Sequence, residues 1–229
     1  MVIVTGASSG IGKAIAEFYL AKGEYVVGIS RTQEINHKNF KFVPCDLSDY
    51  EALQQLELTD YLNEDDRFLL INNAGTVGAI KRAHKVELKD YYNVAVLNIV
   101  ALQHLCSQFL RCNQPNKTIV NISSGAAQRP IPSWAAYCAS KAAVDMFSET
   151  LQAEIDELKG TTKVYSLAPG VVDTKMQVTI RNSNENDFSS HRKFVDLKAS
   201  NALRSPNEVA ELLNEWLNNP DSKGVVDRL

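Results

Sequence analysis

Short runs of β-branched and apolar residues alternate with helical patterns along this chain, and this alternation limits the possible folds more than any other feature. The runs predicted as strands are Val2–Thr5, Tyr25–Ser30, Phe68–Ile71, Thr118–Ile122 and Lys163–Leu167. Because these runs are nearly continuous in apolar residues, we expect helices to cover both faces of the sheet. The pattern therefore predicts an α/β fold with a doubly wound, parallel sheet.

Longer segments complete this picture. Apolar residues recur at helical spacing over roughly Leu88–Cys112 and Ala135–Lys159, which predicts two long helices that could also form a subunit interface. The polar stretch Thr32–Cys45 is too short for a full crossover helix, so a loop is predicted there. Residues 181–201 are rich in Asn, Ser and charged residues, which predicts a mobile substrate loop or short helices rather than core.

Length and charge restrict the class of function. A chain of 229 residues with 45% hydrophobic residues suits one domain, which we predict over residues 1–229. The formal net charge of -3 gives no basic surface of the kind that binds nucleic acid. We find no run of about 20 apolar residues and no leader pattern before the first strand. These features predict a cytoplasmic protein that acts on a small molecule, with neither nucleic acid nor a membrane as partner.

The cysteines indicate neither redox chemistry nor a metal centre. They form no CxxC pair and have no spacing typical of a zinc site, so we predict reduced core thiols and no metal. The four are Cys45, Cys106, Cys112 and Cys138.

A glycine-rich turn follows the first predicted strand and precedes a helical pattern over Lys13–Lys22. Its glycines permit a tight turn, close approach of the backbone to a pyrophosphate, and close packing of helix on strand. The N–H groups and partial positive charge of the helix N-terminus would then face the anion. The predicted contacts are Gly6, Ser8, Ser9, Gly10, Ile11 and Gly12. A purely structural turn and the nucleotide loop of a methyltransferase are the alternatives.

Two residues at later strand ends bear on the choice of cofactor. Arg31 follows the second predicted strand, where an acidic residue would accept the ribose hydroxyls of NAD and an arginine suits the extra phosphate of NADP. Arg31 therefore favours NADP, with a solvated surface arginine as the alternative. Asp46 follows the next strand and could accept a hydrogen bond from the adenine amine or cap the following helix.

Two further segments, Asn72-Asn73-Ala74-Gly75 and Tyr137-Cys138-Ala139-Ser140-Lys141, complete an ordered set of motifs that resembles the short-chain dehydrogenase/reductase family. The resemblance covers essentially the whole chain. It implies a Rossmann fold with a mainly parallel, seven-stranded sheet and helices on both faces. It also implies an NADP-dependent oxidoreductase that acts on a carbonyl or alcohol and assembles as a homodimer or homotetramer.

The resemblance assigns the catalytic roles to Asn98, Ser124, Tyr137 and Lys141. Tyr137 and Lys141 are four residues apart on one helix face, so we expect the ammonium to lower the tyrosine pKa from its usual value of about 10. Ser124 would hold the substrate oxygen. Asn98 would complete a proton relay through Lys141 and water. Alternatively, Asn98 is a structural residue whose buried amide has all its hydrogen bonds within the core.

The same resemblance implies further cofactor contacts. Asn73 and Ala74, with the adjoining Gly75, would line the adenosine side, and Lys141 would hold the nicotinamide ribose beside Tyr137. The segment after the predicted strand Lys163–Leu167, which is the sixth strand in the family's order, would fix the nicotinamide face, and Thr174 would reach the nicotinamide carboxamide. The residues implied in that segment are Pro169, Gly170, Val172 and Thr174.

Local matches around Ser124, Tyr137 and residues 168–177 look closest to the sepiapterin and benzil reductases of the family, which reduce diketones with NADPH. We therefore expect hydride transfer to a vicinal dicarbonyl or aromatic ketone, with Tyr137 as proton donor. A catalytically silent NADP-binding sensor or scaffold is the alternative, although such a module has no need for the Tyr137 and Lys141 pair.

Three residues are candidate substrate contacts. Trp134 precedes the predicted catalytic tyrosine, Met176 follows the nicotinamide segment, and Asp227 matches a pterin-anchoring aspartate only loosely in position. Trp134 and Met176 could equally be core or interface residues.

Overall fold

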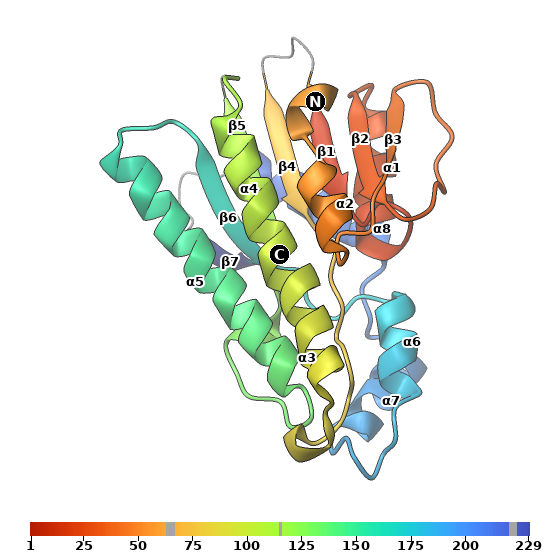
Figure 1. Cartoon of the computed structure of the whole chain (residues 1–229). Helices are drawn as coiled ribbons and strands as arrows, with labels where there is room; N and C mark the ends of the chain where they lie inside the picture. The colour runs from red at the N-terminus through yellow and green to blue at the C-terminus, as the bar shows by residue number, and fades with distance from the viewer. Residues whose placement is uncertain (63–66, 115, 220–223) are drawn as a thin grey trace.

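The computed structural model describes residues 1–62, 67–114, 116–219 and 224–229. It contains the predicted parallel sheet, with seven strands in the order β3-β2-β1-β4-β5-β6-β7 (Figure 1). The strands are β1 (Val2–Thr5), β2 (Val26–Ser30), β3 (Phe40–Pro44), β4 (Phe68–Asn72), β5 (Lys117–Ile122), β6 (Lys163–Ala168) and β7 (Val226–Arg228). The five strands predicted from sequence agree to within one residue at each end, and a loop joins β2 to β3 as predicted.

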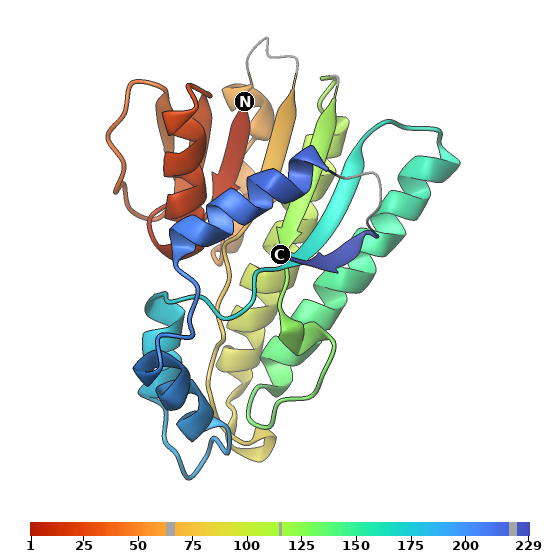
Figure 2. The same ribbon diagram turned by 180° about the vertical axis from the view of Figure 1, so that it is seen from behind.

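Helices cover both faces of the sheet, as the apolar strands predicted. In Figure 1 the near face carries α2, α4 and α5, and Figure 2 shows α1 and α8 on the opposite face. The helices are α1 (Gly10–Ala21), α2 (Tyr50–Gln55), α3 (Leu88–Ala95), α4 (Ala101–Arg111), α5 (Ala135–Glu157), α6 (Lys175–Arg181), α7 (His191–Ala199) and α8 (Pro206–Asn218).

Alternate residues of each strand supply the two halves of the core. In β1, Val2 and Val4 pack with α1 and α8, whereas Ile3 packs with α4 and α5 on the other face. This follows from the two-residue period of a pleated strand. Because both faces of β1 are buried, its first three residues are apolar and all four of its residues are buried.

The helical run predicted over Leu88–Cys112 contains a π-helical turn, η3 (Val96–Val100), between α3 and α4. By length and composition alone, the helix Leu88–Arg111 could cross a membrane, although polar residues such as Asn93, Asn98 and Gln103 interrupt its apolar residues. Its apolar residues Leu102, Leu105 and Phe109 are buried against the sheet in the main core. Their burial accounts for the apolar character of this helix.

The segment 181–201 also departs from prediction. It forms the short helix α7 and turns, as one alternative stated, but it contributes two core residues, Phe188 and Phe194. These rings pack with Trp134 and Tyr137, and we call the four residues the aromatic cluster. The many polar residues between the two phenylalanines hid this contribution in the composition of the segment.

Gly12 has the closest backbone approach in the glycine turn. A Cβ atom at this position would clash with the carbonyl group of Gly6 and with Nδ2 of Asn73. We predict that Gly12→Ala lowers the free energy of unfolding by about 1–3 kcal/mol, the usual cost of overpacking. The matched control is Gly125→Ala, whose Cβ would meet no described atom within 4 Å. Thermal unfolding checks this, and equal melting temperatures for the two variants would contradict it.

Candidate active site

The glycine turn meets two other predicted segments at the carboxyl edge of the sheet. Oγ1 of Thr5 accepts hydrogen bonds from the backbone N–H groups of Asn73 (2.9 Å) and Ala74 (3.0 Å), and Nδ2 of Asn73 donates to the Thr5 carbonyl (2.9 Å). On the other side, a Cβ at Gly10 would lie 3.1 Å from Cγ2 of Thr174. The ends of β1 and β4 and the start of α6 therefore lie close together at this edge of the sheet.

The backbone of this turn fits a bound phosphate. Gly6 and Gly10 have φ angles of +70° and +56°, which L side chains rarely adopt. Ser9 is the N-cap of α1, and among the described residues its side chain makes no capping hydrogen bond. The first turn of α1 carries no acidic residue. Its N-terminus therefore keeps the partial positive charge that favours an anion.

Arg31 and Asp46 lie next to each other at the ends of β2 and β3. Nη1 of Arg31 is 3.9 Å from Oδ2 of Asp46, and the Arg31 side chain is 77% exposed. Oδ1 of Asp46 accepts hydrogen bonds from the N–H and hydroxyl of Ser48, which hold the pKa of this carboxyl below its usual value. Asp49, not Asp46, caps α2 by accepting from Ala52 N (2.8 Å), so the capping alternative for Asp46 was wrong.

Tyr137 on α5 and Ser124, which follows β5, are brought together by the fold. The Ser124 hydroxyl hydrogen-bonds to the Tyr137 phenol, and its oxygen also accepts from Ala126 N at the start of η4 (Gly125–Ala127). Burial raises the pKa of Tyr137, while the bond to Ser124 acts in the opposite direction. The direction expected from sequence was therefore wrong, because burial outweighs the groups that favour the phenolate.

Lys141 is buried one turn further along α5. Its Nζ donates to the Ile122 carbonyl (2.6 Å) and lies 5.9 Å from the centre of the Tyr137 ring. Burial lowers the pKa of Lys141 to about 8, and the carboxylate of Asp145 partly offsets this effect. The ammonium is thus anchored at the end of β5, next to the tyrosine ring.

Asn98 lies in the π-helical turn and is almost fully buried. Its amide exchanges two hydrogen bonds with the backbone of Thr76 and donates a third to Oγ of Ser140 (3.0 Å). These contacts are those of a satisfied core amide. A Cβ at Gly75 would nevertheless lie 3.3 Å from Oδ1 of Asn98 and 3.8 Å from Nζ of Lys141, so these two groups approach each other across Gly75.

The nicotinamide segment predicted after β6 is held by Arg204, which sequence reasoning missed. The guanidinium of Arg204 donates to the carbonyl groups of Pro169 (3.1 Å) and Leu229 (2.6 Å), and its backbone forms a β-bridge with Val172. Gly170 has a φ of +81° directly beside it. No local motif marks Arg204, because its partners are far away in sequence.

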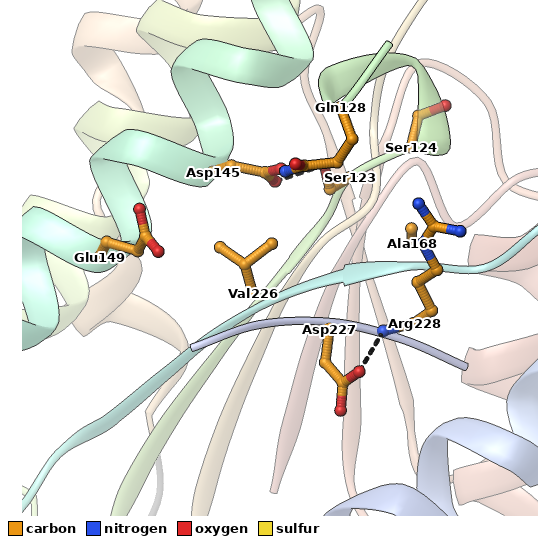
Figure 3. A pocket seen from close by; sticks show the side chains of 9 residues that line it. All are labelled: Ser123, Ser124, Gln128, Asp145, Glu149, Ala168, Val226, Asp227 and Arg228. Atoms are coloured by element: carbon orange, nitrogen blue, oxygen red, sulfur yellow. Dashed lines mark hydrogen bonds between the residues drawn. The ribbon is translucent and has the colours of Figure 1, made fainter. Parts of the chain in front are cut away.

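The candidate substrate residues have different surroundings. Trp134 is buried, stacks on Phe188 with ring centres 5.5 Å apart and meets Tyr137 edge-on at 5.5 Å, while Met176 packs against the same aromatic cluster. Asp227 on β7 accepts hydrogen bonds from Nε1 of Trp216 (3.1 Å) and from Arg228 N (2.8 Å). In Figure 3 its carboxylate points away from Asp145 and Ser123.

A cavity of about 430 Å³ opens beside Ser124, between α5 and the end of the sheet (Figure 3). Ser123, Gln128 and Asp145 contribute polar groups to its wall. Sequence reasoning did not select Asp145, although its position four residues after Lys141 places it on the same helix face.

The comparisons with known proteins agree with this geometry. Residues 1–185 match the family model for short chain dehydrogenases. The chain belongs to the short-chain dehydrogenase family. It is 39% identical to a benzil reductase ((S)-benzoin forming) of Bacillus subtilis (strain 168), covering 99% of this chain and 96% of that protein. It is 31% identical to the sepiapterin reductase of Mus musculus, covering 88% and 85% respectively. The predicted family and branch are thereby confirmed.

Solved structures confirm the fold of this short-chain dehydrogenase. The crystal structure of the KRED1-Pglu enzyme matches it with a TM-score of 0.84 and 25% sequence identity, over 99% of this chain and 98% of the other. A short-chain dehydrogenase/reductase of Saccharomyces cerevisiae, YIR035C, matches with a TM-score of 0.83 and 27% identity, over 99% and 94%.

The lowered pKa of Lys141 predicts a pH dependence of stability. Between pH 8 and pH 10.5 the unfolded chain binds more protons at this lysine than the folded protein does, so the contribution of Lys141 to the free energy of unfolding rises with pH. We predict that wild type gains stability relative to Lys141→Met as the pH increases through this window. Urea unfolding of both proteins at several pH values checks this, because the other groups cancel in the difference. A difference that stays constant would contradict the assignment.

Proposed function

We propose that this short-chain dehydrogenase is an NADPH-dependent carbonyl reductase with Tyr137 as its proton donor. The observation that carries the proposal is the buried Tyr137, which is hydrogen-bonded to Ser124 and adjoins Lys141. This group lies at the carboxyl edge of the sheet, where open α/β folds bind their ligands. A purely structural hydroxyl pair has no need of a buried lysine beside it.

The residues present fit a dinucleotide. Glycines at positions 6, 10 and 12 let the turn pack closely against Asn73 and Thr174, and the N-terminus of α1 next to the turn keeps the partial positive charge that favours a phosphate. Ser8, Ser9 and Ile11 would hold the pyrophosphate. Asp46 and the segment from Asn73 to Gly75 would hold the adenosine, and Arg31 the additional phosphate. Pro169, Gly170, Val172, Thr174 and Lys141 would hold the nicotinamide half. NADPH supplies a hydride when bound.

The residues of the chain then manage the substrate oxygen and its proton. Ser124 donates a hydrogen bond to the carbonyl oxygen and fixes its position next to the phenol. Because burial raises the pKa of Tyr137, the phenol stays protonated at neutral pH and can donate to the developing alkoxide. Asn98, across Gly75 from Lys141, would connect the lysine to a proton relay.

The proposed substrate is a vicinal dicarbonyl or an aromatic ketone. Support comes from the benzil reductase and sepiapterin reductase relatives and from the aromatic cluster, in which the Trp134 ring meets Tyr137 edge-on. Trp134 and Met176 would border the substrate, whereas both carboxylate oxygens of Asp227 already have protein partners. We propose no substrate contact for Asp227 on this ground.

We also propose that the protein is cytoplasmic and that it assembles as a homodimer or homotetramer. In support of the former, all four cysteines lie within the described residues and form no disulfide, which suits a reducing compartment. Three of them are buried, whereas Cys138 is partly exposed and not the core thiol that we predicted.

The central test is Tyr137→Phe. We predict a loss of about 10²–10⁴-fold in kcat for NADPH oxidation with benzil, diacetyl or sepiapterin, since the variant lacks the acidic proton. NADPH should still raise the melting temperature, because the glycine turn is intact. Binding of NADPH without turnover of any carbonyl by the wild-type protein would instead favour the sensor or scaffold alternative. Stabilisation by a methyl donor and not by NADPH would favour a methyltransferase.

Cofactor choice is tested at Arg31. We predict that Arg31→Glu weakens NADPH binding by about 10-fold to 100-fold, the effect of losing a charge-assisted hydrogen bond, and affects NADH much less. Arg111→Glu at the end of α4 makes the same charge change away from the glycine turn. Steady-state kinetics of wild type and both variants with each cofactor measure the preference for NADPH over NADH. An unchanged NADPH preference in Arg31→Glu would assign the phosphate contact to another residue.

A further inference from the structure

Asp145 is a buried carboxylate, 6% exposed, for which the proposed chemistry has no use. It lies one turn after Lys141 on α5, on the helix face that packs against the ends of β5 and β6. A buried carboxylate is costly unless hydrogen bonds satisfy it, so the groups that satisfy it indicate its role.

Three side chains donate to this carboxylate. Oδ1 accepts from the hydroxyl groups of Ser123 (2.5 Å) and Ser166 (2.7 Å), and Oδ2 accepts from Nε2 of Gln128 (2.9 Å). Ser123 immediately precedes Ser124, and Gln128 immediately follows η4, the short helix that Ser124 caps. In Figure 3 the Asp145 carboxylate points toward the side chains of Ser123 and Gln128.

The two donors therefore lie at the two ends of the segment that carries Ser124. Ser166 on β6 adds a link to the neighbouring strand, where it pairs in register with Asn121. The segment is thus fixed to α5, the helix that also carries Tyr137 and Lys141. Rigid placement matters here because a displacement of about 1 Å in a positioning group can cost about 10²-fold in rate.

We infer that Asp145 is a positioning residue that holds the 123–128 segment so that the Ser124 hydroxyl faces Tyr137 and the substrate oxygen. The inference rests on the proposed function, because it concerns the geometry of the same reaction. It adds a residue that acts through Ser124 and touches neither substrate nor cofactor.

The test is a double-mutant cycle of Asp145→Asn with Ser124→Ala, measured by NADPH oxidation with benzil. The asparagine keeps the shape of the side chain and removes its charge and one acceptor. We expect Asp145→Asn to lower kcat about tenfold or more, with the KM for NADPH unchanged. In the Ser124→Ala background the same change should have little further effect, because the group that it positions is gone. A general loss of stability would give the same factor in both backgrounds.

Asp156→Asn is the matched control, since Asp156 is a carboxylate on the same helix that accepts from Gln152 (2.8 Å) away from Ser124. It should keep wild-type kinetics. If Asp145→Asn does not fold, Gln128→Ala replaces it in the cycle, because it removes only the link after η4 from an exposed residue. It should lower kcat several-fold in the wild-type background and have little effect with Ser124→Ala.

The outcomes separate the two claims. If Ser124→Ala turns over benzil as fast as wild type does, the proposed function is overturned, and the inference fails with it. If Ser124→Ala loses turnover, the inference alone is overturned by either of two results. In the first, the Asp145 or Gln128 variant keeps wild-type kinetics; in the second, it lowers kcat by the same factor with and without Ser124.

Discussion

The packing of α5 against the ends of β5 and β6 is the interaction on which the site depends. A row of buried polar groups on this helix satisfies groups of the strands: Lys141 donates to Ile122, Asp145 accepts from Ser123 and Ser166, and Gln152 accepts from Val164 N. Each bond must form, because a buried polar group without a partner costs about 1–3 kcal/mol. The directional bonds fix the height and rotation of α5, and thus of Tyr137, more tightly than apolar packing alone would.

The edge at which we propose that the cofactor binds is fixed by a second set of hydrogen bonds and close contacts that apolar packing could not supply. Thr5 at the end of β1 binds the backbone that follows β4, and Gly12 allows α1 to approach that junction. Both contacts join segments that adjoin through the parallel pairing of β1 with β4. The turn proposed to hold the phosphates is consequently part of the sheet connection itself. The proposed substrate side, built on β5 and α5, is a separate structure that meets this turn at Gly75 and Lys141.

Much of the fold follows from the sequence because strand periodicity and glycine turns are local signals. The same holds for the pairing of Tyr137 with Lys141, which lie one helical turn apart. The missed features are non-local. Arg204 contacts Pro169 across 35 residues, and Phe188 meets Trp134 only after the polar segment folds back. The pKa of Tyr137 was assigned the wrong direction for the same reason, since its burial depends on the aromatic cluster, which includes residues from 181–201.

The raised pKa of Tyr137 fits the role of proton donor that we propose for it. Burial raises the pKa of Tyr137 and lowers that of Lys141 to about 8, so the phenol stays protonated at pH values where the lysine has begun to lose its proton. Reduction of a carbonyl consumes a proton and needs a protonated phenol, whereas oxidation of an alcohol needs a phenolate that can accept one. A buried phenol whose pKa is raised therefore suits the donor role that we propose for Tyr137, because ionising it would place a negative charge in a site shielded from water.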